Sequence, residues 1–130
     1  MAKKIITTPN APGRDYGPFS QAVRAGDFLF VMGQAAFDPK KLRKVVGKDI
    51  KKQTRRTLQN IKAIVEAAGG SLEDVVQVRV FLTKAKDWPL MNEVYVEFFP
   101  DAPPARTAVI VELAAKGLLV EIDAIAYLGK

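Results

Sequence analysis

The sequence predicts an α/β protein of the α+β type, with one mixed sheet of about six strands and two helices on one face of the sheet. Two observations support this fold class. Apolar segments that suit strands alternate with two segments of helical spacing, in the order strands, helix, strand, helix and two strands. The chain of 130 residues also contains no repeat, low-complexity tract or linker, so we expect residues 1–130 to form a single domain.

The first half of the chain predicts a strand followed by a helix. Residues 28–34, FLFVMGQ, form a short apolar run after a Gly-Asp pair at 26–27, which indicates a buried strand after a tight turn. Asp49 suits the N-cap of a helix, and the two glycines at 69–70 suit its end. The residues between them recur at helical spacing: Ile50, Thr54, Leu58, Ile61, Val65 and Ala68.

The second half begins with a strand and a second helix. Residues 75–83, VVQVRVFLT, are rich in β-branched side chains and alternate in character, as a strand does. The alternation assigns one face to Val76, Val78, Val80 and Leu82. Pro89 suits the first turn of a helix and Pro100 its end. The apolar stripe of this helix is predicted to be core and consists of Leu90, Met91, Val94, Tyr95 and Phe98.

Two final strands are predicted at residues 105–113 and 118–128. The faces expected to pack against the helices are Thr107, Val109, Val111 and Leu113 in the first strand, and Val120, Ile122, Ala124, Ala126 and Leu128 in the second. The opposite faces mix charged residues with Ile110, Ile125 and Tyr127. Such a surface is too apolar to face water comfortably, so we expect another subunit to cover it.

The composition limits the available chemistry. The chain contains neither Cys nor His, which removes the thiolate nucleophile, the usual general base and the commonest zinc ligands. Any reaction must use Arg, Lys, Asp, Glu, Tyr, Asn or the backbone. The apolar runs are only a few residues long, and the first ten residues lack the apolar stretch of a signal peptide. We therefore expect a cytoplasmic protein without a membrane segment.

An ordered set of short motifs runs from about Thr8 to Tyr127. The set consists of Gly17-Pro18-Phe19-Ser20-Gln21-Ala22, Gly33-Gln34, Asn60-Ile61, Asn92 followed by Tyr95 and Phe98-Phe99, Pro104-Ala105-Arg106, and Val120-Glu121-Ile122-Asp123-Ala124-Ile125-Ala126. Together these motifs resemble the RidA (YjgF) family of imine deaminases. The resemblance implies a chorismate-mutase-like fold and a homotrimer with active clefts between subunits.

The resemblance also implies a reaction: hydrolysis of 2-imino acids, such as 2-iminobutanoate and 2-iminopropanoate, to 2-keto acids and ammonia. Arg106 matches the arginine that anchors the substrate carboxylate, a task for which its fork of donors is suited. Glu121 matches the acidic residue that positions or activates the attacking water. Asn92, Phe19 and the backbones of Gly33 and Ala108 match residues that line the pocket. Neither a metal nor an organic cofactor is implied, since an imine carbon is already electrophilic.

The chain departs from the family pattern at several of these positions. The family usually has tyrosine at Phe19, often has cysteine at Ala108 and commonly has serine at Met32. The loop from Gly13 to Tyr16 also has one extra residue compared with the family pattern, which makes Tyr16 a candidate source of the missing hydroxyl.

Other interpretations stay open. A lone arginine at the start of a strand is more often an ion-pair partner than a ligand clamp, and Glu121 could pair with Arg79 or with Arg106. The net charge of +6, with ten of the twenty Lys and Arg between Lys40 and Lys62, also suits nonspecific binding of nucleic acid. No aromatic side chain lies in that segment for bases to stack on. The resemblance implies ribonuclease or translation-inhibitor activity for some family members, so an RNA-binding protein, endoribonuclease or translation inhibitor of the same family is the alternative function.

Overall fold

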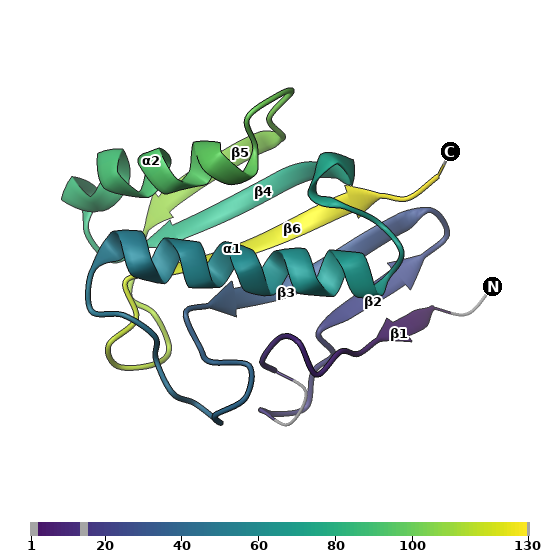
Figure 1. Ribbon diagram of the computed structural model, residues 1–130, viewed down its shortest axis with the longest axis horizontal. Helices are drawn as coiled ribbons and strands as arrows, with labels where there is room; N and C mark the ends of the chain where they lie inside the picture. The colour runs from purple at the N-terminus through teal and green to yellow at the C-terminus, as the bar shows by residue number, and fades with distance from the viewer. Residues whose placement is uncertain (1–2, 14–15, 130) are drawn as a thin grey trace.

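The computed structural model describes residues 3–13 and 16–129, and within them six strands form one mixed sheet with two helices on one face (Figure 1). The strands are β1 (Lys4–Ile6), β2 (Ala22–Ala25), β3 (Phe28–Ala35), β4 (Val75–Leu82), β5 (Ala105–Ile110) and β6 (Val120–Tyr127). The helices are α1 (Ile50–Ala67) and α2 (Trp88–Phe98), with short 3₁₀ turns at Leu72–Asp74 and Ala85–Asp87. The predicted arrangement of one mixed sheet and two helices is confirmed.

The strand order in the sheet is β1-β2-β3-β6-β4-β5. Neighbouring strands are antiparallel except β4 and β5, which run parallel. A parallel pair needs a crossover connection, and α2 provides it between β4 and β5. The last strand, β6, lies between β3 and β4, so the early and late parts of the chain share one sheet, with β5 at an edge.

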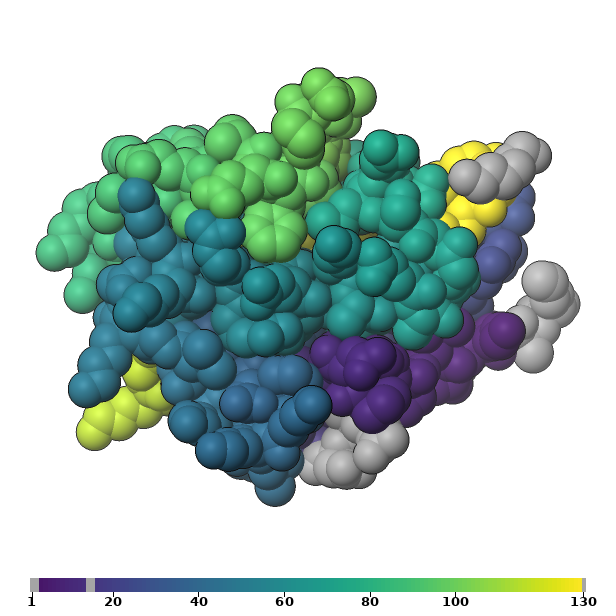
Figure 2. Space-filling model, viewed as in Figure 1, coloured from purple at the N-terminus to yellow at the C-terminus, as the bar shows by residue number. Residues whose placement is uncertain are grey.

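The hydrophobic core lies between the helices and one side of the sheet. We call this side the covered face and the other side the open face. Side chains of α1 at 58, 61, 64 and 65 are at most 1% exposed and pack with those of β4 and β6, which are Val78, Val80, Leu82, Val120 and Ile122. Figure 2 shows that α1, α2 and the loop before α1 hide most of the covered face. No helix in the described ranges is both long enough and apolar enough to span a membrane.

Helix α1 begins and ends as the sequence predicts. The Asp49 carboxylate accepts a hydrogen bond of 2.9 Å from the Lys52 backbone N–H and so caps the first turn. The helix ends before Gly69, whose φ of +90° is one that glycine adopts readily. Its buried side also carries polar groups: the Gln53 side chain bonds Gly117 O and Leu119 N, and the Asn60 amide bonds Ala35 O and Phe37 O. These bonds hold the loops at one end of the sheet.

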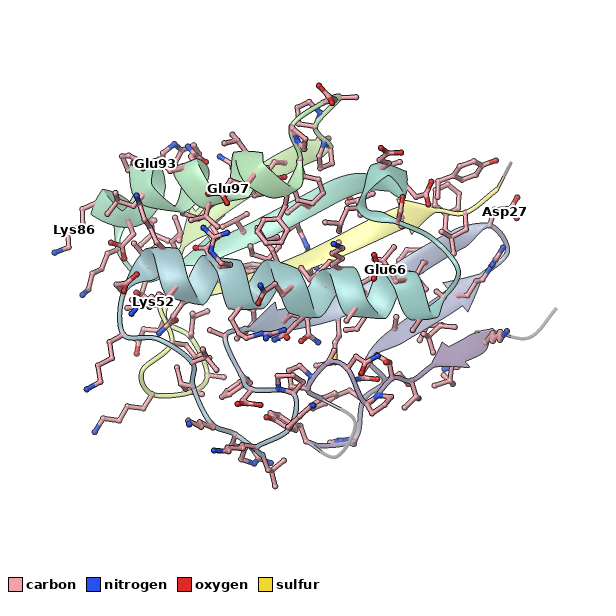
Figure 3. The ribbon with its side chains drawn as sticks, in the orientation of Figure 1. Asp27, Lys52, Glu66, Lys86, Glu93 and Glu97 are labelled. Atoms are coloured by element: carbon pink, nitrogen blue, oxygen red, sulfur yellow. The ribbon has the colours of Figure 1, made fainter. Side chains whose placement is uncertain are left out.

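Helix α2 starts at Trp88, with Pro89 in its first turn as predicted. Met91 and Val94 are buried, but Leu90, which the apolar pattern assigned to the core, is 40% exposed because it lies at the margin of the buried side. Two ion pairs of 2.7 Å join the helices, Lys51–Glu93 and Arg55–Glu97. Figure 3 shows Glu93 and Glu97 on α2 along its boundary with α1.

Three predictions about strand faces need correction. The strand β3 is not buried on both sides, because Phe28 and Phe30 are 43% and 47% exposed on the open face. In β4, a β-bulge between Val75 and Gln77 turns Val76 out of the core, where it is 45% exposed. The third correction is that the two faces of β5 are exchanged. This strand is also shorter than predicted, because it ends at Ile110 instead of residue 113.

The predicted faces of β5 are reversed in the structure. Arg106 lies opposite Val78 and Ala108 opposite Val80, so both side chains are on the covered face. Thr107 and Val109 are exposed on the open face. The pattern misled because β5 is an edge strand whose two faces are both partly apolar. The predicted faces of β6 are correct: residues 120, 122, 124 and 126 are buried, and Glu121 and Asp123 lie on the open face.

Gln21, directly before β2, ties the loop between β1 and β2 to the sheet. Its Oε1 accepts from the Thr8 N–H at 2.7 Å, and its Nε2 donates to the carbonyls of Thr8, Ala11 and Pro12 at 2.8–3.1 Å. The side chain is 2% exposed. A buried amide that satisfies four backbone groups is expensive to remove.

Replacing Gln21 by Leu should therefore lower the free energy of unfolding by about 3 kcal/mol, because several buried backbone groups lose their partners. Chemical denaturation measures the difference. Gln59→Leu, on the exposed side of α1, is the matched control and should change stability by less than about 0.5 kcal/mol. Equal stability of the two variants would contradict the structural role of Gln21.

Candidate active site in two parts

Glu121 lies on the open face, beside a pocket of about 360 Å³ at the end of β3. The loop between β1 and β2, Phe37 and Ala114 form its other walls. Apart from Glu121 the pocket is largely apolar, and its lining residues are Pro12, Gly13, Tyr16, Phe19, Met32, Gly33, Gln34, Ala35, Phe37, Ala114 and Glu121. We call this group the glutamate pocket.

Gly33 allows Glu121 to lie across β3. A Cβ at position 33 would collide with the Glu121 carboxylate, so only glycine leaves space for that side chain in its observed position. The β-bulge between Val31 and Gln34 places this glycine beside Glu121. The local structure of β3 thus leaves room for the carboxylate in this position.

The surroundings of Glu121 favour its protonated form. Burial raises the pKa of the Glu121 carboxyl, and the negative charge of Asp123 raises it further. Asp123 itself is engaged by Arg79, whose guanidinium donates to both carboxylate oxygens at 2.6–3.0 Å. Within the described residues Glu121 has no ion pair, so neither of the two pairings left open by the sequence, with Arg79 or with Arg106, is formed.

Arg106 lies on the covered face of β5, against α2. Its Nη1 donates a hydrogen bond of 2.7 Å to Oδ1 of Asn92. The guanidinium carbon is 4.9 Å from the centre of the Trp88 ring and 4.8 Å from that of Tyr95. No carboxylate in the described part of the chain lies within 4.0 Å of this guanidinium. We call Arg106, Asn92, Trp88 and Tyr95 the arginine cluster.

The Tyr95 ring is a neutral neighbour of Arg106. Burial raises the pKa of the Tyr95 phenol, and the Arg106 charge opposes this shift. The phenol consequently stays protonated at neutral pH. The cluster therefore surrounds a cation with uncharged partners only: one amide oxygen and two aromatic rings.

The structure divides the residues that the sequence singled out into two groups. Phe19, Gly33 and Glu121 line the glutamate pocket. Arg106, Asn92 and Ala108 lie on the other side of the sheet, at its β5 edge. The sequence reasoning did not separate these groups, because it assigned Arg106 and Glu121 to the same face.

Sequence reasoning also missed Trp88 and assigned Tyr95 to the core alone. Their spacing holds the missing signal: residues 88, 92 and 95 are four and three apart, which places them on one side of a helix. Tyr16 does line the glutamate pocket, as Phe19 does, and the Phe19 side chain is 47% exposed. The Tyr16 hydroxyl accepts a hydrogen bond of 2.7 Å from the Arg43 N–H, so its oxygen already serves to join two loops.

Comparison with known proteins assigns the family. The family model described as Endoribonuclease L-PSP matches residues 8–128. The chain belongs to this family, which is also called the RidA (YjgF, RutC) family. A RutC family protein of Pyrococcus horikoshii is 54% identical over 125 residues, which is 96% of this chain and 98% of that protein.

Two further relatives connect the RidA family to a reaction and to a solved fold. A protein of Dermatophagoides farinae named 2-iminobutanoate/2-iminopropanoate deaminase is 39% identical, over 95% of this chain and 94% of its own. RidA from an Antarctic Psychrobacter is 44% identical in sequence, and its crystal structure superposes with a TM-score of 0.84, covering 95% of this chain and 98% of its own.

In residues 3–13 and 16–129, acidic side chains form no group of three or more that could hold a metal ion.

The pKa of Glu121 generates a stability prediction. A raised pKa in the folded state means that the fold favours the neutral carboxyl, so this contribution is present at low pH and is lost as the pH rises through the folded pKa. Glu121→Gln should therefore have a higher melting temperature than the parent at pH 7. The gain should shrink as the pH falls to 4.5, the ordinary glutamate value, and below it.

Thermal melting at pH 7 and at pH 4 tests this expectation. Glu112→Gln, at an exposed glutamate beyond β5, is the matched control for loss of one negative charge. A Glu121→Gln variant that is less stable than the parent at pH 7, or a gain that grows on acidification, would contradict the inferred environment.

Proposed function

We propose that this protein is a hydrolytic deaminase that converts 2-imino acids, such as 2-iminobutanoate and 2-iminopropanoate, to 2-keto acids and ammonia. The observation that carries the proposal is the arginine cluster, which holds a permanent cation among uncharged partners. Carboxylates of the chain engage Arg79 and Arg55, whereas in the described residues Arg106 has only an amide oxygen and two rings as partners and keeps donors for an external carboxylate. The name of the Dermatophagoides relative supports the same reaction.

Arg106 is proposed to bind the substrate carboxylate. Guanidinium groups bind carboxylates through two parallel N–H···O bonds, and a planar 2-imino acid presents its carboxylate next to the reacting carbon. Asn92 occupies an N–H of Nη1 and thereby fixes the rotation of the guanidinium plane. Ala108, one step along the same face of β5, is proposed to contact the substrate through its backbone.

Glu121 is proposed to move the protons of the reaction. Its carboxylate takes a proton from water as the water oxygen bonds to the imine carbon, and passes that proton to the imine nitrogen, which gives a tetrahedral amino alcohol. The carboxylate then takes the proton of the new hydroxyl as the keto group forms, and gives it to the nitrogen as the C–N bond breaks and ammonia leaves. Within one chain the pKa of Glu121 is raised, and Arg106 of the neighbouring subunit would act in the opposite direction, so the carboxyl can both accept a proton and release it.

The two residues can act on one substrate only if two chains contribute to the site. Arg106 is on the covered face of the sheet and Glu121 is on the open face, with β4 between their strands. We propose a homotrimer in which the arginine cluster of one subunit meets the glutamate pocket of the next, lined by Phe19 and Gly33. Exposed apolar residues on the open face support such an assembly: Phe28, Phe30, Val109 and Tyr127.

Substitutions in either half should impair the reaction differently. Arg106→Lys keeps the charge but loses the planar fork, and a lost charge-assisted bond of about 1.5–3 kcal/mol reduces kcat/KM by about 10- to 150-fold. Arg106→Ala should reduce kcat/KM further, because it removes the charge as well. Glu121→Gln should lower kcat while the protein still binds 2-ketobutyrate. Steady-state imine hydrolysis and calorimetry measure these effects, and near-normal rates in all three variants would refute the proposed site.

Mixing the two inactive variants tests whether a site spans two chains. When Arg106→Ala and Glu121→Gln chains are refolded together, each mixed trimer contains one intact pair, so a random mixture should recover about one quarter of the parent activity. If both residues belong to the same site within one chain, mixing restores nothing. Sedimentation equilibrium on the mixture verifies the trimer, and a stable monomer at micromolar concentration would contradict the assembly.

Two observations favour the alternative function, RNA binding or cleavage: the basic segment from Lys40 to Lys62 and the description of the family model as Endoribonuclease L-PSP. The structure weakens this alternative, because Glu93 and Glu97 of α2 neutralise two cations of α1. We expect any binding of RNA to be electrostatic and dispensable for imine hydrolysis.

Paired and unpaired cations should therefore differ in their effect on RNA binding. Lys48→Gln with Lys52→Gln removes two exposed lysines, and its matched control, Lys51→Gln with Arg55→Gln, removes the two paired ones. The first double variant should lose several-fold more affinity for RNA, and both should retain imine hydrolysis. Binding that persists at high salt with a sequence preference would favour the alternative function instead.

A further inference from the structure

Trp88 is an exposed aromatic residue whose position in the arginine cluster gives it a use. It is the only tryptophan of the chain and the first residue of α2, and it is 42% exposed. A large apolar side chain at the surface of a helix end contributes little to the core. Its ring nevertheless lies 4.9 Å from the Arg106 guanidinium carbon, within the range of a cation–π contact.

Among the described residues, every partner of the Arg106 guanidinium belongs to helix α2. Trp88, Asn92 and Tyr95 follow each other on one side of α2. The helix is fixed by Pro89 in its first turn and by buried Met91 and Val94. The side chain of Arg106 is therefore held by a rigid surface, although no opposite charge restrains it.

Aromatic partners suit an arginine that must bind an anion. A carboxylate beside Arg106 would neutralise it and occupy the N–H donors that a substrate needs. A ring that contacts the guanidinium through its π-face attracts the cation without accepting hydrogen bonds in the guanidinium plane. The attraction thus restricts the side chain while most of its donors stay available.

We propose that Trp88 is a positioning residue for Arg106 and sets the affinity of the site for the carboxylate of its substrate. This inference rests on the proposed function. Trp88 acts through the guanidinium and takes no part in proton transfer, so its effect is the same on the bound substrate and on the transition state. Loss of its ring should accordingly raise KM and leave kcat nearly unchanged.

The exposure of Trp88 makes it a suitable residue to test. Tyr95 contacts Arg106 from 4.8 Å as well, but it is 5% exposed and packs against Phe99 with ring centres 4.8 Å apart. Its removal would disturb the core and confuse stability with binding. Trp88 can be replaced with little cost to the folding of one chain, because much of its side chain lies outside the core, and sedimentation equilibrium on each variant checks that the trimer is kept.

The experiment compares Trp88→Leu and Trp88→Phe with the control Leu90→Ala, an equally exposed residue of the same helix. Trp88→Leu should raise the KM for 2-iminobutanoate and the Kd for 2-ketobutyrate by about 2- to 30-fold, with kcat within about 2-fold of the parent. Trp88→Phe retains an aromatic face and should recover most of the affinity. Leu90→Ala should behave as the parent does.

A double-mutant cycle shows whether Trp88 acts through Arg106. In an Arg106→Ala background, Trp88→Leu should change the residual kcat/KM by less than about 2-fold. An equal loss in both backgrounds, or a loss in kcat without a change in KM, would overturn the positioning role. If Arg106→Ala is itself fully active, the proposed function fails. If Arg106→Ala is impaired and Trp88→Leu is not, only the inference about Trp88 fails.

Discussion

The pairing of β4 with both of its neighbours determines what one chain can do. Because β5 is in register with β4 at Val78 and Arg106, the guanidinium must lie under the helices. Because β6 pairs Glu121 with Phe81, the carboxylate must lie on the other side. Side chains of a strand alternate strictly between faces, so no rotamer brings the two groups together. A reaction that needs both groups therefore requires assembly, and the apolar open face provides a reason to assemble.

The two halves of the candidate site are rigid for different reasons. On the covered face, α2 is the crossover that makes the parallel pairing possible, and the same helix presents Trp88, Asn92 and Tyr95 to Arg106. At the glutamate pocket, buried side-chain amides of Gln21 and Asn60 satisfy backbone groups of the surrounding loops. Helix packing holds one half, and buried hydrogen bonds hold the other.

The sequence predicts well those features that depend on local periodicity. The spacing of α1 and its Asp49 cap are reproduced, as are the faces of β6, because one side of each is buried in the same core. The assignment of the β5 faces was wrong because neither face of this edge strand is fully buried, so its two faces differ little in character. Arg106 and Glu121 stood out only through the family resemblance, and no local pattern could tell that they lie on opposite faces. Trp88 was missed because the sequence does not distinguish an aromatic ring that contacts a cation from any other exposed apolar side chain.

The arginine cluster also gives the protein an optical property. Trp88 is its only indole, and the guanidinium carbon of Arg106 lies 4.9 Å from the centre of that ring. The excited state of an indole is strongly dipolar, so its emission depends on the electric field across the ring. A carboxylate that docks on Arg106 offsets the positive charge and changes this field. Ultraviolet-excited emission of the unlabelled protein can therefore follow the arrival and departure of an acid in real time, without a dye or a coupled enzyme.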